Sequence, residues 1–152
     1  MRWPSVLVLV CALALAGCFE PADRRPGTRL SGEVVEALPH DWSFSDEYRE
    51  VALEVRTPWL LPHSVTIVCA ALGDRLWIGA RNPDAKRWPG LVTRQPEVRL
   101  KIGERIYVAR LREVDDFEEV RQAREAYAKK YGSRNPPPPG APPIRYWRVE
   151  SR

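Results

Sequence analysis

The sequence of 152 residues lacks an apolar run long enough to cross a membrane as a helix. Its one long apolar segment, residues 6–16, is shorter than the roughly 20 residues that a spanning helix needs. The sequence also lacks a strong excess of charge, since 24 basic and 20 acidic residues are interspersed along it. No basic face of the kind that binds nucleic acid is indicated, so no nucleic-acid partner is expected.

Motifs for several common chemistries are absent as well. The sequence has no paired-cysteine spacing and no His-Glu-x-x-His pattern, so no metal site is expected. It has no Gly-x-Ser-x-Gly turn, no Walker phosphate loop and no dinucleotide-binding glycine pattern. The residues by themselves therefore assign neither a reaction nor a substrate.

The apolar segment has the length of a signal-peptide core, and Arg2 precedes it. It ends in Leu15-Ala16-Gly17-Cys18, which resembles the lipobox of bacterial lipoproteins. The resemblance implies that residues 1–17 are a signal peptide, that Cys18 carries a diacylglycerol and an N-acyl chain such as palmitate, and that these chains hold the protein at a membrane. An ordinary secretory signal with a chance cysteine, or a buried helix, is the alternative interpretation.

The same resemblance indicates a compartment. In lipoproteins of the enterobacterial type an aspartate after the cysteine retains the protein in the inner membrane, and here that position is Phe19. We therefore expect a lipid-anchored protein of the cell envelope that faces the periplasm, with the outer membrane favoured over the inner. After removal of Cys11 and lipidation of Cys18, Cys69 would be the single unmodified cysteine, which excludes an intramolecular disulfide.

Residues 18–31 contain proline, glycine and charge without an apolar period, which predicts a lipidated tether before a domain over residues 32–152. Residues 33–38 indicate a short first strand. Residues 50–56 alternate between apolar and polar, as in a strand with one buried face. Residues 64–72 are apolar nearly throughout, which predicts a central strand covered on both faces.

Two hairpins follow. A Gly-Asp turn at 73–74 leads into a strand over 75–80, and a Gly-Glu turn at 103–104 joins strands over 97–102 and 105–114. A mainly β (α+β) fold with six to seven antiparallel strands is expected, and closing such a sheet into a small barrel removes its edges.

One helix is predicted over about residues 116–131, with Asp115 or Asp116 as its N-cap and Gly132 as its end. Four large apolar residues recur at helical spacing and are expected to face the barrel: Phe117, Val120, Tyr127 and Tyr131. The proline-rich residues 135–143 predict a stiff spacer before a last strand over 144–150. A docking segment for another protein is the alternative for these prolines.

The middle of the chain resembles the FMN-binding split-barrel superfamily, which includes pyridoxamine 5'-phosphate oxidases and deazaflavin-dependent nitroreductases. The resemblance lies in a strand over 65–72, a Gly-Asp turn, a strand over 76–80, a loop with Lys86, and "QPEVRL" at 95–100. It covers about residues 45–150. It implies a split barrel that binds FMN or a related flavin as a homodimer, with redox chemistry if the protein is an enzyme.

In that family, strand residues and a loop lysine or arginine hold the flavin phosphate at the dimer interface. The residues that match by position are Ser64, Thr66, Arg81, Lys86 and Trp88. Cationic and hydroxyl groups suit a phosphate, and an aromatic ring can stack on a flavin. His63 stands where the oxidases have an arginine, and Pro89-Gly90 replaces an asparagine of the nitroreductases. These departures favour an alternative, in which a non-catalytic lipoprotein uses the barrel to bind a small ligand or a protein.

The remaining candidate residues are aromatic or single. Trp59 and Trp88 lie in expected loops and are predicted at the rim of a ligand site, whereas Trp77 and Trp147 are predicted as barrel packing. Cys69 lies in an apolar strand and is predicted to be a buried, unreactive thiol.

Overall fold

The computed structural model describes residues 19–132 and 136–152. The predicted signal peptide, the lipidation predicted at Cys18 and the first residue of the predicted proline spacer lie outside this part of the chain. Within it the strands form one eight-stranded sheet: β1 (Glu33–Val35), β2 (Val51–Arg56), β3 (Pro62–Ile67), β4 (Cys69–Leu72), β5 (Arg75–Arg81), β6 (Glu97–Ile102), β7 (Arg105–Glu113) and β8 (Ile144–Glu150).

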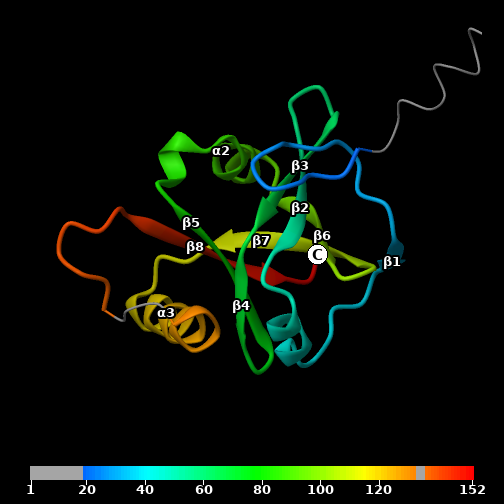
Figure 1. The fold of residues 1–152 in the computed structure, drawn as a ribbon. Coiled ribbons are helices and arrows are strands. Elements are labelled where there is room, and N and C mark those ends of the chain that lie inside the picture. Colours follow the sequence, from blue (N-terminus) through cyan, green and yellow to red (C-terminus); the bar gives the residue numbers. More distant parts are fainter. Residues whose placement is uncertain (1–18, 133–135) are drawn as a thin grey trace, which may run out of the picture.

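The sheet curls on itself, as its strand order requires. The order is β3-β2-β6-β7-β8-β5-β4, with β1 added in parallel to β7. β3 and β4 are the two ends of this order, yet only Val68 separates them in the chain. The ends of the sheet must therefore meet, and Figure 1 shows the resulting barrel. The predicted split barrel of mainly antiparallel strands is confirmed.

The prediction of one strand over residues 64–72 is wrong, because these residues belong to two strands, β3 and β4. β3 pairs with β2, whereas β4 pairs with β5. The chain changes partner at Val68, whose carbonyl oxygen accepts a hydrogen bond from the Tyr127 hydroxyl at 2.8 Å. Both predicted hairpins are confirmed, β4 with β5 and β6 with β7.

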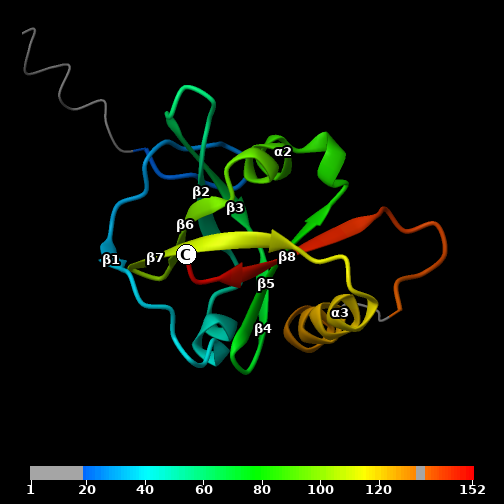
Figure 2. The ribbon, with the colours of Figure 1, turned by 180° about the vertical axis from the view of Figure 1, so that it is seen from behind.

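Two α-helices lie at opposite ends of the barrel (Figures 1 and 2). α3 (Phe117–Tyr131) matches the predicted helix: the Asp116 carboxylate accepts from the Glu119 amide at 2.8 Å, and Gly132 ends it with φ 67°. α2 (Arg87–Arg94) was not expected, because its Pro-Gly pair indicated a loop. Residues 19–132 and 136–152 therefore contain two α-helices, whereas the sequence predicted one there.

One member of the predicted apolar stripe of α3 faces solvent. The Phe117 side chain is 81% exposed, whereas Ala123 and Ala126 are buried against the sheet. Phe117 and Ala123 point about 120° apart at the helical rotation of about 100° per residue. The other three predicted residues, Val120, Tyr127 and Tyr131, do pack against the sheet beside these two alanines, so the prediction is wrong only for Phe117.

The core has two parts on the two sides of the sheet. Inside the barrel, Trp42, Leu53 and Leu100 belong to a large cluster that also includes Trp147. A second, smaller cluster lies between the sheet and α3 and contains Trp77 and Tyr146, among others. Burial of this much apolar surface is the main term that favours the fold. The packing predicted for Trp77 and Trp147 is confirmed.

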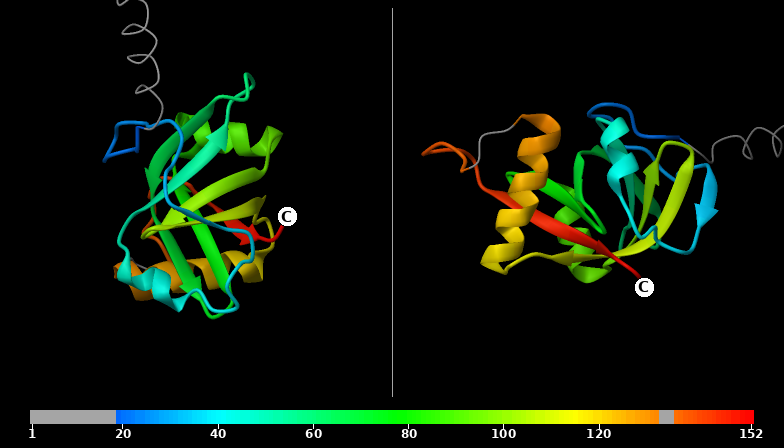
Figure 3. Two further views of the ribbon diagram at one scale, coloured as in Figure 1. Left: turned by 90° about the vertical axis from the view of Figure 1, so that its right-hand side faces the viewer. Right: turned by 90° about the horizontal axis from the view of Figure 1, so that it is seen from below.

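Residues 19–31, here called the N-terminal strap, lie against the barrel although the sequence predicted a tether there. Gly27 and Ser64 exchange two backbone hydrogen bonds, of 2.8 and 3.0 Å, which add the strap to the edge of β3. Leu30 is buried, and its amide donates to the Glu54 carboxylate at 2.7 Å. Figure 3 shows the strap (blue) crossing the end of the barrel that α3 does not cover.

Candidate functional site

A cavity of about 740 Å³ opens between the N-terminal strap, β3, β5 and the start of α2. Ligand sites in proteins have volumes of roughly 300 to 1,000 Å³. The residues that line it come from these four segments and from the connections next to the strands and to α2: Asp23, Arg24, Arg25, Pro26, Glu50, His63, Val65, Thr66, Ile67, Val68, Gly79, Arg81, Lys86, Arg87 and Trp88.

The strap places two arginines in this cavity. The amide and carbonyl of Ala22 exchange hydrogen bonds with those of Arg25, at 2.9 and 3.2 Å, which closes a tight turn. Asp23 has φ 50°, a conformation that aspartate tolerates better than most residues. Because Gly27 then pairs with β3, the turn that carries Arg24 is held at the cavity.

The connection from β5 to α2 supplies the opposite wall. Asn82 has φ 51° and starts a short 3-10 turn, η2 (Pro83–Ala85), whose first residue is a proline. Lys86 is extended and directly precedes α2. This sharp change of direction brings Lys86 over the cavity from the side opposite the strap.

The lining of the cavity is strongly cationic. It carries five arginine or lysine side chains and two carboxylates, an excess of three positive charges: Arg24, Arg25, Arg81, Lys86 and Arg87 against Asp23 and Glu50. Within residues 19–132 and 136–152, none of these five cations has a salt-bridge partner within 4.0 Å. Such a surface attracts an anion, and charge-assisted hydrogen bonds can then fix it.

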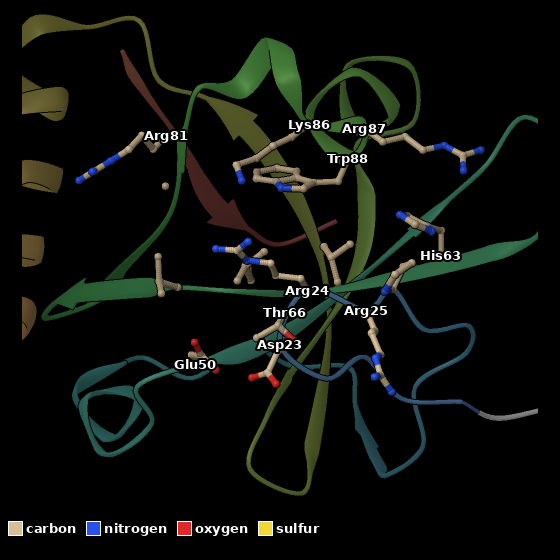
Figure 4. Close-up of a pocket in the computed structure, with 15 residues that line it drawn as sticks. Asp23, Arg24, Arg25, Glu50, His63, Thr66, Arg81, Lys86, Arg87 and Trp88 are labelled. Carbon is tan, nitrogen blue, oxygen red and sulfur yellow. The ribbon is translucent and has the colours of Figure 1, made fainter. Parts of the chain in front are cut away.

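The five cations do not all point the same way (Figure 4). Lys86 and Arg24 extend into the same central space, with Thr66 below them and the Trp88 ring beside the Lys86 side chain. Arg81 points away toward α3, and Arg87 points to the opposite side. The anion site indicated by this geometry therefore consists chiefly of Arg24, Lys86 and the Thr66 hydroxyl.

His63 lies at one end of the cavity, where burial and then the positive charge of Arg87 lower its pKa below the ordinary value of 6.5. The imidazole is therefore mainly neutral at pH 7. A bound anion would oppose this effect, because negative charge favours the protonated ring.

Four of the five residues predicted for the site line this one cavity: Thr66, Arg81, Lys86 and Trp88. Ser64 does not. It is fully buried on β3, and a Cβ atom placed on Gly27 would come within 2.6 Å of its hydroxyl oxygen. The strap thus covers the hydroxyl that the sequence comparison assigned to a ligand.

The two tryptophans predicted at a ligand rim lie elsewhere than expected. The Trp88 side chain is in α2, only 4% exposed, and packs edge-on against Trp147 with ring centroids 4.8 Å apart. Trp59 is 84% exposed and is not among the residues of the cavity. Most of the Trp88 ring therefore packs in the core, and only a small part of it faces the cavity.

The strap arginines were missed by the sequence analysis. "DRR" at residues 23–25 looked like part of a solvated tether, and nothing local shows that Gly27 pairs with a strand almost forty residues later. Arg87, which follows Lys86 directly, was also passed over. A cluster of basic residues in a segment without apolar period was the only available signal.

A second hollow of about 540 Å³ adjoins the cavity and shares Val68, Gly79 and Arg81 with it. Its other walls are aromatic or proline side chains in the main: Arg124, Tyr127, Tyr131, Pro137, Pro138, Ala141, Pro142, Ile144 and Tyr146. Arg81 thus lies between a cationic cavity and a largely apolar one. The two together suit a ligand with an anionic part and a flat ring.

Cys69 takes no part in either hollow. It is fully buried, and burial raises its pKa to about 11, which agrees with the unreactive thiol predicted for it. Within residues 19–132 and 136–152, no group of three or more histidine, cysteine, aspartate or glutamate side chains could hold a metal ion. No helix in this described part is long and apolar enough to pass through a bilayer.

Comparison with solved structures supports the fold. A candidate pyridoxamine 5'-phosphate oxidase from Listeria innocua superposes with a TM-score of 0.51 at 14% identity, over 70% of this chain and 86% of the other. A conserved hypothetical protein from Mycobacterium tuberculosis gives 0.55 at 11% identity, over 80% and 86%. A candidate 5-nitroimidazole antibiotic resistance protein from Bacteroides thetaiotaomicron gives 0.55 at 12% identity, over 86% and 90%.

The names of the first and third structures fit the class that the sequence resemblance indicated, and the chain shares the fold of all three. No protein-family model matches the sequence, and no curated protein is significantly similar to it. At such low identity the similarity concerns the fold, so an activity has to be argued from the cavity.

Proposed function

We propose that this protein binds FMN, or a related phosphorylated flavin, in the cavity between the N-terminal strap and α2. The observation that carries the proposal is the convergence of Arg24 and Lys86 above Thr66 in a split barrel (Figure 4). Two cations and a hydroxyl are the donors that a phosphate dianion requires. The volume of about 740 Å³ and the excess of positive charge fit such a ligand.

The chain's own residues would have three tasks toward that ligand. Arg24 and Lys86 would bind the phosphate, and the Thr66 hydroxyl would orient it by donating a hydrogen bond. The apolar hollow beyond Arg81 would receive the flat ring system and exclude water from it. A bound flavin would supply electron or hydride transfer.

The proposal is tested by titrating the purified protein with FMN and with riboflavin, which differ only in the phosphate. Two charge-assisted hydrogen bonds at about 1.5 kcal/mol or more each predict that FMN binds at least about a hundredfold more tightly. Equal affinities would show that the cationic site does not hold the phosphate. Failure of both flavins to bind would overturn the proposal altogether.

Ligand binding without turnover is the second candidate function. The burial of Ser64 and the packing of Trp88 favour it, since Ser64 is covered by the strap and most of the Trp88 ring is buried in the core. The flavin-loaded protein discriminates between the two. An enzyme would oxidise a nicotinamide donor in the presence of a quinone or nitroaromatic acceptor, and a scaffold would bind flavin without doing so.

We further propose that lipid on Cys18 anchors the protein in the cell envelope, where it faces the periplasm. The outer membrane is favoured over the inner. The support is the Leu-Ala-Gly-Cys sequence at the end of a signal-like segment. Mass analysis of protein purified from its native membrane tests it. The expected mass lacks residues 1–17 and includes a diacylglycerol, and an unmodified Cys18 would refute the anchor.

A homodimer is proposed on the resemblance alone, because that family places its flavin between two copies of the chain. Light scattering of the detergent-solubilised protein, with and without FMN, tests it. A dimer that FMN stabilises is expected. A monomer at all flavin concentrations would mean that the strap has taken the place of the second subunit.

A further inference from the structure

The turn between β2 and β3 carries three exposed apolar side chains in succession, here called the apolar tip: Trp59, Leu60 and Leu61. They are 84%, 66% and 62% exposed. Single exposed apolar residues are ordinary, but three adjoining ones at the end of a protruding hairpin usually mark a contact surface. Neither the cavity nor the core uses them.

The tip is an ordered turn. The Thr57 amide donates to the Leu61 carbonyl at 3.0 Å, and the Leu60 amide donates to the Thr57 carbonyl at 2.8 Å. Leu60 has φ 59°, in the left-handed region that glycine or asparagine would occupy without strain. The turn therefore holds apolar side chains outward at a position where a small or polar residue would be more stable.

The tip lies at the end of the molecule from which the chain continues toward Cys18. The strap pairs with β3 at Ser64, three residues beyond the tip, and a Cβ on Gly27 would lie 2.3 Å from the Phe19 carbonyl oxygen. Phe19 is itself 56% exposed, and Cys18 directly precedes it in the sequence. Figures 1 and 3 show the tip and the start of the strap at the same end, opposite α3.

The charge around the tip suits an anionic surface. No acidic residue occurs between Val55 and Gly73 in the sequence, and the exposed Arg56 directly precedes the turn. Arg87 is close enough to lower the pKa of His63, two residues after Leu61. Apolar side chains flanked by arginines are typical of protein segments that lie in the interface of a bilayer with anionic lipids.

We propose that the apolar tip inserts into the surface of a lipid bilayer with anionic headgroups, beside the lipid on Cys18. Tryptophan and leucine suit that depth, since an indole prefers the boundary between headgroups and acyl chains. A second copy of the chain is a weaker occupant, because a specific interface buries about 800 Å² on each partner and the tip is one short convex turn. The insertion would fix the orientation of the barrel above the membrane. This inference deepens the proposed membrane location.

Trp59 itself reports the insertion. The other tryptophans of the described residues, Trp42, Trp77, Trp88 and Trp147, are at most 4% exposed, so aqueous quenchers reach mainly Trp59. The full protein is reconstituted into vesicles of phosphatidylethanolamine and phosphatidylglycerol that contain brominated acyl chains. We expect brominated lipid to quench Trp59, its emission to shift to the blue, and acrylamide quenching to be lost.

The matched control moves the exposed tryptophan to the far end of the molecule. Phe117 is 81% exposed at the start of α3, so the double variant Trp59→Phe, Phe117→Trp should fold like the parent. The tryptophan introduced by Phe117→Trp should remain accessible to acrylamide and should not be quenched by brominated lipid. If Trp59 in the parent behaves in the same way as this control reporter, the tip does not insert and the inference is overturned.

Mass analysis of the same sample separates the inference from the anchor. A lipidated protein whose Trp59 stays in water refutes the tip and keeps the anchor. A protein without lipid whose Trp59 is nevertheless quenched by brominated lipid supports the tip and refutes the anchor. A protein that neither carries lipid nor associates with the vesicles refutes both.

Discussion

At the α3 end of the barrel the charged side chains are paired, whereas at the cavity end they are not. The Glu119 carboxylate accepts from Arg112 at 2.8 Å and from the Trp77 indole at 3.2 Å, and Arg148 lies 3.3 Å away. In the cavity, Arg24 and Lys86 have no such partner among the described residues. Paired charges hold a helix on a sheet, and unpaired charges are available to a ligand.

The pKa of Glu119 reflects this difference. Burial raises it, but the hydrogen bonds from Arg112 and Trp77 and the charge of Arg148 outweigh burial and lower it below 4.5. Its contribution to stability is therefore present above pH 4.5 and is lost as the pH falls through the lowered value. Substitutions at the α3 end should therefore lower the free energy of unfolding, whereas substitutions at the cavity end should weaken ligand binding.

The largest effect is expected from Glu119→Ala. It leaves the buried Trp77 indole without its acceptor and removes one of the two carboxylates that bind Arg112 and Arg148, which keep Glu150. The free energy of unfolding should therefore fall by about 3 kcal/mol. FMN affinity should not change. Urea denaturation measures the first and fluorescence titration the second. The control Glu118→Ala removes an exposed carboxylate paired with Arg121 and should lower the free energy of unfolding far less, because solvent screens that pair. Equal losses in the two variants would contradict a structural role for the Glu119 network.

Gly27→Ala should affect both properties, because the strap connects the cavity to the barrel. The added Cβ would lie 2.3 Å from the Phe19 carbonyl oxygen and 2.6 Å from the Ser64 hydroxyl. Relief of this overlap should cost about 2 kcal/mol in unfolding free energy and displace Arg24, which weakens FMN binding.

Gly90→Ala is the matched control for the strap variant, since a Cβ on Gly90 in α2 meets nothing within 4 Å. It should leave FMN affinity unchanged and stabilise the protein by up to about 1 kcal/mol. An FMN affinity that survives Gly27→Ala would show that Arg24 is not part of the site.

Lys86→Ala should change binding alone. Loss of one charge-assisted hydrogen bond of about 1.5 kcal/mol or more predicts at least about tenfold weaker FMN binding, with riboflavin affinity unchanged. The unfolding free energy should stay within about 0.5 kcal/mol of the parent, because Lys86 has no salt bridge among the described residues. Lys129→Ala, on the exposed face of α3, is the control and should change neither property. A parallel loss of riboflavin binding would assign Lys86 to the ring and not to the phosphate.

The smallest effect is expected from the pH dependence of His63. Its pKa is lowered by burial and by Arg87, so the unfolded chain takes up a proton before the folded one does. Stability is therefore full above pH 6.5 and declines as the pH falls from there toward the lowered value. Melting temperatures between pH 7 and 5 should show this decline, and His63→Gln should reduce it. Saturating FMN should reduce it too, and an unchanged slope with ligand would place the phosphate away from His63.

Local patterns in the sequence were sufficient for most of the barrel. Alternation defined β2 and β6, glycine turns defined two hairpins, and Asp116 and Gly132 marked both ends of α3. These features depend on neighbours within a few residues. The break at Val68 was not predictable, because an apolar strand looks the same whether it keeps or changes its partner.

The site was only partly predictable for the same reason. The resemblance by position indicated Thr66 and Lys86 from the local order of strand, turn and loop, and both line the cavity. It also indicated Ser64, which the strap covers, and it did not indicate Arg24, because the surroundings of both residues depend on where the strap lies. The exposure of Phe117 was likewise decided by two small alanines that bring the helix close to the sheet.

The sequence by itself determined the kind of fold and the presence of cations near β5, because the period of apolar residues and the turns are local properties of the chain. Tertiary structure alone decided which cations converge and which apolar residues stay exposed. The physical reason is that Gly27 pairs with Ser64 across 37 residues and brings the strap over the cavity. Burial, pairing and exposure are properties of the folded surface, and the order of residues does not specify them one by one.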